Sequence, residues 1–371
     1  MRVADWIIGS LHNLGLRKVF GVTGGAVVHL FDAAKNYEDI DITFFNHEQS
    51  ASFAVESYTK LTGEISLCIV TTGPGATNAI TGLSAAWLDS VPAIFISGQA
   101  RSNNIIAGRK LRQVGTQEID IIPIVKSITN YSSQIREINN VKKELLKAIQ
   151  FRLKGRPGPV WLDIPVDILW ANYNEKLLNS DNIIISNKIE KNKNLEIFLR
   201  EKISKSSKLL LLLGGGCRTP VLQNLDLILK QIDIPFVTTW LGFDLIDFNE
   251  KNHLGHVGMA GHRGANLAIG NCDLLITIGS SVSTSVTTTK PENFAENALR
   301  ININIDSNDF EHTRKFFHHN IEESALNALN CLLFCLALLF NCLSFGLVFI
   351  IEVSTVVHQV FIRLFPCPGI Q

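Results

Sequence analysis

Glu48 is the residue of this sequence whose type and position best suit chemistry. It follows His47 at the end of a predicted strand and directly precedes a predicted helix. A carboxylate in the first turn of a helix is stabilised by the positive end of the helix dipole, and that effect alone explains a glutamate here. The alternative is functional. Because ligands of open α/β sheets bind beyond the carboxyl ends of the strands, Glu48 is also placed to hydrogen-bond a ring nitrogen of a cofactor.

Glycine-bearing loops follow other predicted strands of the same region. The segment Thr71–Asn78, TTGPGATN, ends a strand and opens a helix. Its glycines let the backbone approach a ligand closely, and the amides at a helix start favour an anionic or polar group. Such a loop is more often a plain turn. Similar junctions recur at Val19–Gly25 and Ser97–Gln99, however, and their repetition at one edge of one sheet favours a site.

The elements that must position these residues alternate between strand and helix. Short, continuously apolar strands separated by helices are typical of a parallel sheet that is covered on both faces. The predicted strands of the first 170 residues are Lys18–Gly21, Ile40–Phe45, Ile65–Thr71, Ala93–Ser97 and Val160–Asp163, and the predicted helices are Ala4–Leu14, Gln49–Leu61 and Thr77–Leu88.

A second α/β unit follows a polar linker. Residues 171–207 are dense in Asn, Lys, Ser and Glu, apart from a helical piece near Leu195–Ile203. The triplet Gly214–Gly216 lacks the spacing of a dinucleotide loop and is interpreted as a strand-to-helix turn. In residues 208–320 the predicted strands are Lys208–Leu213, Phe236–Thr239, Leu274–Ile278 and Leu299–Ile305, with a helix at Pro220–Gln231. The fold class is therefore α/β, with two doubly wound parallel-sheet domains at residues 1–170 and 208–320.

Composition narrows the class of protein. The 371 residues include 34 Lys+Arg and 34 Asp+Glu, and this balance argues against a nucleic-acid partner. Hydrophobic residues make up 46 % of the chain, which suffices for sizeable cores. Seven cysteines without tight spacing predict neither a zinc site nor a disulfide framework, and residues 1–20 contain no continuous apolar stretch typical of a signal peptide. A cytoplasmic location is expected.

Residues 321–371 form an atypical hydrophobic tail that breaks this description. From Cys331 to Ile351 the chain reads CLLFCLALLFNCLSFGLVFII, without a formal charge, and is long enough to cross a bilayer core of about 30 Å. Three interpretations stay open: a buried core helix, a C-terminal membrane anchor and an aberrant chain end. Contact with a membrane is expected only through residues 331–351.

Five motifs in order give the first domain a family resemblance. They are VFGVTGG, NHEQSASFAVESYTKLTG, TTGPGATNAITGLSAAWLDSVPAIFISGQ, GTQEIDIIPIVKSIT and GRPGPVWLDIPVD. In this order and spacing they resemble the pyrimidine-binding domain of thiamine-diphosphate-dependent enzymes of the acetolactate synthase type. The segments LLLLLGGG, IPFVTTWLG, HLGHVGMAGHRGANLAI, CDLLITIGS and ALRININID resemble the central domain of the same family. Together the resemblance covers about 310 residues.

The resemblance implies a role for each matching residue. Glu48 matches the family's catalytic glutamate, which hydrogen-bonds N1′ of the cofactor's aminopyrimidine and so promotes loss of the thiazolium C2 proton. Thiamine diphosphate then serves as the electron sink for decarboxylation of a small 2-oxo acid. Gln99 and Gln117 are implied on the substrate side, and a homo-oligomer through the pyrimidine-binding domain is implied as well. The implied cofactor-binding residues are Gly24, Gly25, Glu48, Thr72, Gly73, Pro74 and Asn78.

Three departures from the family pattern shape the expected function. Thr116 replaces the phenylalanine of the family's FQE motif, so the 2-oxo acid and its acceptor stay open. Residues Gly279–Thr284 lack the charged side chains with which many acetolactate synthases contact FAD, so FAD is less expected than thiamine diphosphate. No GDG…N segment, which in the family holds Mg²⁺ and the diphosphate, follows Asp306. We therefore expect no metal ligand in this chain, and Mg²⁺ only with a partner that supplies a diphosphate domain.

The expected function is thiamine-diphosphate-dependent decarboxylation or carboligation of a 2-oxo acid, by a transferase or lyase present as a truncated chain. Two alternatives stay open beside it. One is a remnant that folds and turns nothing over. The other is the pyrimidine-domain subunit of a split enzyme whose diphosphate domain lies on another chain.

Overall fold

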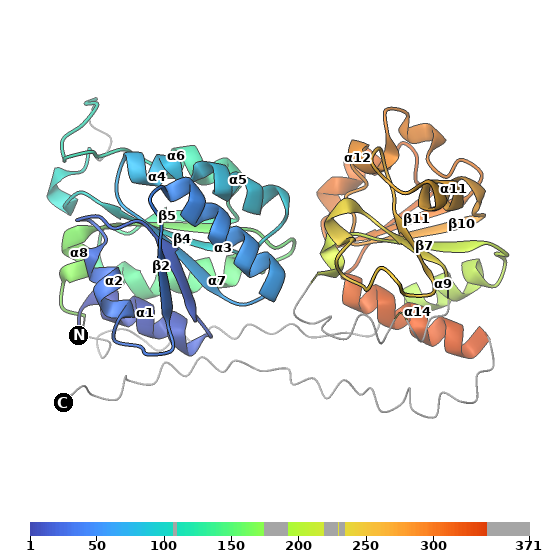
Figure 1. The fold of residues 1–371 in the computed structure, drawn as a ribbon, viewed down its shortest axis with the longest axis horizontal. Helices are drawn as coiled ribbons and strands as arrows, with labels where there is room; N and C mark the ends of the chain where they lie inside the picture. The colour runs from blue at the N-terminus through green and yellow to red at the C-terminus, as the bar shows by residue number, and fades with distance from the viewer. Residues whose placement is uncertain (107–109, 174–191, 219–228, 230–233, 340–371) are drawn as a thin grey trace. The chain divides into compact units, whose positions relative to one another are not determined.

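Two parallel six-stranded sheets, each in its own unit, organise the chain (Figure 1). The computed structural model describes residues 1–106, 110–173, 192–218, 229 and 234–339. Each sheet is flanked by helices, so the predicted α/β class with two doubly wound domains is confirmed.

The first sheet has the strand order β2-β1-β3-β4-β6-β5, and each neighbouring pair is parallel. Its strands are β1 (Lys18–Gly21), β2 (Asp41–Phe44), β3 (Ser66–Val70), β4 (Ile94–Gln99), β5 (Tyr131–Gln134) and β6 (Val160–Pro165). Its helices are α1 (Val3–Asn13), α2 (Val28–Ala34), α3 (Glu48–Thr62), α4 (Pro74–Asn78), α5 (Ile80–Leu88), α6 (Ile122–Val125), α7 (Val141–Phe151) and α8 (Val166–Trp170).

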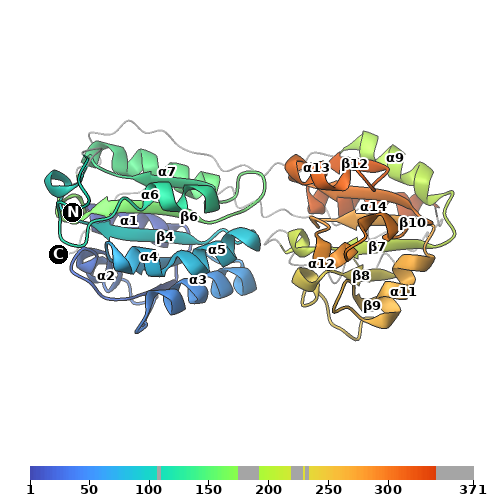
Figure 2. The ribbon, with the colours of Figure 1, turned by 90° about the horizontal axis from the view of Figure 1, so that it is seen from above.

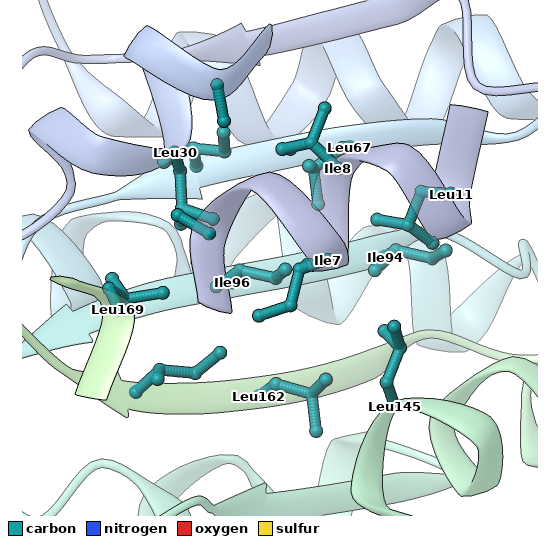
Figure 3. Close-up of a cluster of buried hydrophobic side chains, with 14 of the residues drawn as sticks. Ile7, Ile8, Leu11, Leu30, Leu67, Ile94, Ile96, Leu145, Leu162 and Leu169 are labelled. Atoms are coloured by element: carbon teal, nitrogen blue, oxygen red, sulfur yellow. The ribbon is translucent and has the colours of Figure 1, made fainter. Parts of the chain in front are cut away.

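Apolar side chains on both faces of this sheet explain why helices cover both. On one face α1, α2, α7 and α8 bury the cluster drawn in Figure 3, in which Ile7 and Leu11 of α1 lie against Ile94 and Ile96 of β4. On the other face α3, α4, α5 and α6 pack over Phe95 and neighbouring strand residues (Figures 1 and 2). The buried strands are therefore continuously apolar, as the sequence pattern predicts.

The chain reverses its direction of winding at β1. The connection from β1 leads to β2 on one side, whereas β3 and β4 follow on the other side. The loops that leave β1 and β3 therefore diverge at the carboxyl edge of the sheet and form a topological switch point, the usual ligand site of such folds. Of the residues singled out in the sequence, Gly24 and Gly25 follow β1, Glu48 follows β2, the turn of Thr72 and Gly73 follows β3, and Gln99 ends β4.

The second sheet has the strand order β12-β11-β10-β7-β8-β9. Its strands are β7 (Leu209–Leu213), β8 (Phe236–Thr238), β9 (His253–His256), β10 (Leu274–Ile278), β11 (Leu299–Asn304) and β12 (His319–Glu322). Its helices are α9 (Lys193–Ile203), α11 (Arg263–Asn271), α12 (Thr284–Thr287), α13 (Phe310–Thr313) and α14 (Ala325–Leu339). The helix expected at Pro220–Gln231 falls almost wholly on residues 219–228 and 230–233, outside the described residues.

The second unit extends beyond the boundaries of 208 and 320 expected from the sequence. Helix α9, placed in the linker by its polar composition, buries Leu195, Leu199 and Ile203 in the core of this unit. Helix α14, placed in the hydrophobic tail, packs beside α9 and buries Leu329 and Leu332 in the same core. The beginning of the tail is thus a core helix. Its continuation, residues 340–371, lies outside the described residues.

None of the helices among the described residues is both long enough and apolar enough to cross a membrane. This finding covers α14 as far as Leu339.

Candidate functional site

The loops after β1 and β3 meet at the switch point through glycine and threonine. A Cβ atom on Gly24 would lie 2.5 Å from the Cβ of Thr71, and a Cβ on Gly75 would lie 2.7 Å from its Cγ2. Thr71 therefore fills the space that side chains at these two glycines would need. This role of Thr71 was not predicted, because the sequence around Thr71 does not show which of its residues contacts the loop after β1.

Glu48 is the first residue of α3 and is half-buried. His47 caps this helix, because its Nδ1 atom accepts a hydrogen bond from the backbone N–H of Gln49 at 3.1 Å. The Oε2 atom of Glu48 accepts a hydrogen bond at 2.9 Å from the Nδ2 of Asn78, at the end of α4. Two residues that the sequence put forward separately are thus joined, and Asn78 holds one side of the carboxylate.

The other carboxylate oxygen of Glu48 faces backbone. Its Oε1 atom lies 3.3 Å from the position that a Cβ on Gly75 would take, and no described residue donates a hydrogen bond to it. The charge of Glu48 also acts on Cys68 of β3, because burial raises the pKa of that thiol and the charge of Glu48 raises it further. A carboxylate with one oxygen fixed by an amide and the other bordered by glycine can accept a hydrogen bond from a ligand.

The turn at Gly73 requires glycine. Its backbone has φ +61° and ψ −115°, a conformation that side-chain-bearing residues rarely adopt. A Cβ there would lie 2.0 Å from the backbone oxygen of Gln117. Pro74 then begins α4 as its first residue, a position that suits its fixed φ. The turn is therefore pressed against the loop that carries Gln117.

Gly25 differs from the other glycines of the site. No described heavy atom lies within 4 Å of the position of a Cβ at this residue, which is exposed. Its backbone borders open space beside the Gly24–Thr71 contact. The structure therefore separates glycines that pack against protein, Gly24 and Gly73, from one that borders open space.

Gln99, expected on the substrate side, lies buried at the end of β4, with 1 % of its surface exposed. Its Oε1 accepts hydrogen bonds from the Thr72 hydroxyl at 2.6 Å and from the Ala100 N–H at 2.9 Å. Its Nε2 donates to the carbonyl of Ile119 at 2.9 Å and to Asp163 at 3.1 Å. These four bonds fill the amide. In this structure Gln99 contacts protein, and Thr72 is tied to it.

Gln117, the other residue expected on the substrate side, is exposed and has φ +58°, an uncommon value for a residue with a side chain. The next residue fixes its loop. The Glu118 carboxylate accepts hydrogen bonds from the backbone N–H groups of Ile106, Val114 at 3.0 Å and Gly115 at 3.1 Å. Glu118 was not among the predicted site residues, although it stands in the same motif.

Asp163 is a buried carboxylate near the site that sequence reasoning missed. It belongs to β6 and is 1 % exposed. Burial raises its pKa to about 6, although hydrogen bonds from Gln134, Ser97 and Gln99 act in the opposite direction. In the sequence it stands inside the apolar run VWLDIP, which indicates a strand and carries no sign of its partners.

Comparison with known proteins bears on both units. Residues 1–124 match the family model of the thiamine pyrophosphate enzyme N-terminal TPP binding domain, and residues 198–331 match the thiamine pyrophosphate enzyme central domain. The chain belongs to the thiamine pyrophosphate enzymes. The match of the central domain ends inside α14, in agreement with the packing of that helix.

Among thiamine pyrophosphate enzymes the chain is similar to acetolactate synthase large subunits. It is 33 % identical to that of Lactococcus lactis over 305 residues, which cover 81 % of this chain and 52 % of the relative. It is 32 % identical to the large subunit of Escherichia coli isozyme 2 over 336 residues, 89 % of this chain and 58 % of the relative. The chain therefore spans about half the length of the curated relatives it matches.

The site fits the pyrimidine half of thiamine diphosphate. Its chemistry suits a ring nitrogen, because one carboxylate oxygen of Glu48 is held by Asn78 and the other accepts no hydrogen bond from a described residue. Among the described residues no three His, Cys, Asp or Glu side chains are grouped as a metal site. In the second unit Gly214 and Gly216 pack against the backbone of Gly279, at 2.2 Å and 2.8 Å from their Cβ positions, which explains that triplet as a packed turn.

Proposed function

We propose that this chain supplies the pyrimidine-binding half of an active site for thiamine-diphosphate-dependent decarboxylation or carboligation of a 2-oxo acid. The observation that carries the proposal is the Glu48 carboxylate at the switch point, with Asn78 on one oxygen and the Gly75 backbone beside the other. The family match of residues 1–124 supports the same conclusion.

Glu48 is proposed as the catalytic residue, because it can share a proton with N1′ of the bound pyrimidine. Asn78 holds the carboxylate in place through its side-chain amide. Thiamine diphosphate, when bound, supplies the electron sink for loss of carbon dioxide from the 2-oxo acid. The pyrimidine is proposed to lie along Gly24, Gly25 and the turn of Thr72, Gly73 and Pro74.

We propose that both Gln99 and Gln117 serve the substrate side of the site, one indirectly and the other by direct contact. Gln117 is exposed and can reach a ligand directly. Gln99 acts by holding Thr72 and the chain at Ile119. Mg²⁺ is proposed only where a diphosphate-binding domain completes the site, and FAD is not needed for this chemistry.

A homo-oligomer is proposed through the face of α3 and α5, which pack side by side (Figure 2). This face exposes apolar side chains: Phe53 is 38 % exposed, Trp87 36 % and Leu88 69 %. Large exposed apolar side chains on neighbouring helices are the kind of surface that an interface covers. A cytoplasmic location is part of the same proposal.

Reconstitution tests the proposed function. The full chain is mixed with the remaining half of the Lactococcus lactis large subunit, thiamine diphosphate, Mg²⁺ and pyruvate, and carbon dioxide is measured. We expect turnover that Glu48→Gln lowers on the order of 10²–10⁴-fold, because glutamine hydrogen-bonds without sharing a proton. The same substitution at the exposed Glu38 should leave the rate unchanged. Full activity of Glu48→Gln would overturn the assignment, and no turnover by any mixture would favour a non-catalytic chain.

A further inference from the structure

Asp163 of β6 accepts hydrogen bonds from three donors on the two neighbouring strands β4 and β5. Its Oδ1 accepts a hydrogen bond from the Ser97 hydroxyl at 2.6 Å. Its Oδ2 accepts bonds from the Nε2 atoms of Gln134, at 2.7 Å, and Gln99, at 3.1 Å. Ser97 in turn accepts a bond from the indole N–H of Trp161 at 2.9 Å. Donors on β4 and β5 thus hold both oxygens of the carboxylate, and Trp161 of β6 holds the Ser97 hydroxyl.

The fixed Oδ2 atom orients the Gln99 amide. A rotation of that amide by half a turn would bring its carbonyl oxygen against the Asp163 carboxylate and its NH₂ group against the Ala100 N–H. Both contacts would be repulsive, and the bond to a carboxylate is the stronger kind of hydrogen bond. In the observed orientation the carbonyl oxygen faces the Thr72 hydroxyl, and one N–H faces the Ile119 carbonyl.

The orientation of Gln99 matters because its bonds to Thr72 and to the Ile119 carbonyl hold the two chain segments that meet at Gly73. Thr72 directly precedes Gly73, and Ile119 lies two residues after Gln117. The Cβ position of Gly73 lies 2.0 Å from the backbone oxygen of Gln117, so the turn and the loop touch there. Gln99 therefore ties the turn to the loop at the place where the proposed cofactor site meets the proposed substrate side.

We propose that Asp163 is a positioning residue of this site, whose Oδ2 atom fixes the Gln99 amide and thereby the Gly73 turn against the Gln117 loop. The inference rests on the proposed function for its chemical consequence, whereas the hydrogen-bond chain itself stands on the structure alone. It is the acceptor at Oδ2 that matters, because asparagine can offer a carbonyl oxygen in the same place and leucine cannot.

The first test needs no activity. The full chain is labelled with ¹⁵N-glutamine, and exchange of the Gln99 side-chain amide protons is followed by NMR, with Gln99→Met to assign the signal. Asp163→Leu should speed this exchange at least about tenfold, the equivalent of losing one hydrogen bond. Asp163→Asn should keep it slow, and so should Ser97→Ala, which removes the Oδ1 partner and the acceptor of Trp161 but leaves both bonds at Oδ2 in place. Unchanged exchange in Asp163→Leu, or equally fast exchange in Asp163→Asn, would overturn the proposal.

The second test uses the reconstituted mixture and also serves if Asp163→Leu fails to fold. Gln99→Met keeps Asp163 with its other two donors and should raise the thiamine diphosphate concentration at half-maximal rate about tenfold, with a smaller effect on kcat. Asp163→Leu should do the same and add nothing in the Gln99→Met background. An unchanged half-saturation in Gln99→Met, or additive effects, would contradict the proposal. If the wild-type mixture is inactive, the proposed function fails, and the exchange experiment still decides the role of Asp163.

Discussion

Alanine substitution at two glycines of the site should have opposite consequences. Gly73 has a positive φ, and its Cβ position lies 2.0 Å from the Gln117 backbone oxygen, whereas no described atom lies within 4 Å of the Cβ position of Gly25. Both residues were expected from the sequence to bind the cofactor. The structure predicts that only Gly73 also supports the fold.

The magnitude for Gly73→Ala follows from two contributions. A side-chain-bearing residue in such a backbone conformation costs about 1–3 kcal/mol. The backbone oxygen of Gln117 is no flexible group, so it must move by roughly 1 Å or more to reach ordinary contact distance, which adds an overpacking cost of about 1–3 kcal/mol. We expect a total loss of about 2–6 kcal/mol from the stability of the first unit. Gly25→Ala should stay within about 0.5 kcal/mol of wild type.

Urea unfolding followed by amide hydrogen exchange measures this difference, because exchange reports the first unit separately from the second. In the reconstituted mixture Gly25→Ala should still weaken use of thiamine diphosphate, since its methyl group would enter the open space beside the site. Wild-type stability of Gly73→Ala would refute the reasoning about the turn. A loss in Gly25→Ala as large as that in Gly73→Ala would refute the distinction between the two glycines.

Three further predictions concern pH, the second core and assembly. Burial raises the folded-state pKa of Asp163 to about 6, well above the ordinary value of an aspartate carboxyl. Because the folded chain binds this proton more tightly, wild type should gain about 2 kcal/mol relative to Asp163→Asn as pH falls from 7 to 4, and a constant difference in unfolding free energy would contradict this. Leu332→Ala should destabilise the second unit by about 2–5 kcal/mol, because the Leu332 side chain is 0 % exposed. The control substitution Asn330→Ala, at a half-buried position of the same helix, should change the stability little, and equal effects of the two substitutions in thermal unfolding would show that α14 is no core helix. Phe53→Arg should weaken assembly and so lower the molecular mass measured by sedimentation equilibrium, whereas the control Leu254→Arg in the second unit should leave the mass unchanged. An unchanged mass in Phe53→Arg would exclude the α3 face from the interface.

The pattern of apolar strands predicted the architecture well because most strands are buried on both faces. Strands β1 (Lys18–Gly21) and β10 (Leu274–Ile278) have the predicted bounds, and the other predicted strands differ by one or two residues at one or both ends. Of the four edge strands, β2 was predicted, whereas β5, β9 and β12 were missed. Tyr131–Gln134 reads YSSQ and is half-buried, so no apolar run marks it, although it pairs with β6. Edge strands need fewer apolar residues, because only part of their surface meets the core.

Helix α14 shows the opposite difficulty. Its sequence, ALNALNCLLFCLALL, has too few polar residues to reveal which side faces the core, so a core helix and a membrane segment look alike. The packing partner that decides between them is α9, more than a hundred residues earlier in the chain. Periodicity within either segment carries no information on that pairing.

The sequence predicted the site residues that lie at strand ends. It did not predict the hydrogen bonds between side chains that are far apart in the sequence. Glu48 and Asn78 were both expected from the sequence, but the bond between their side chains joins positions thirty residues apart. The link between Gln99 and Asp163 spans 64 positions, and Asp163 is hidden in an apolar strand. Hydrogen-bond partners of this kind are set by tertiary packing, which a single sequence does not display.

The central claim is that Glu48 meets N1′ of the thiamine diphosphate pyrimidine. The most direct measurement is the NMR shift of ¹⁵N-labelled N1′ when the cofactor is titrated with the full chain. Wild type and the control Glu38→Gln should both move the N1′ resonance toward that of a protonated or strongly hydrogen-bonded ring nitrogen, and Glu48→Gln should leave it near its value in free solution. An N1′ shift that is the same in Glu48→Gln as in wild type would contradict the account.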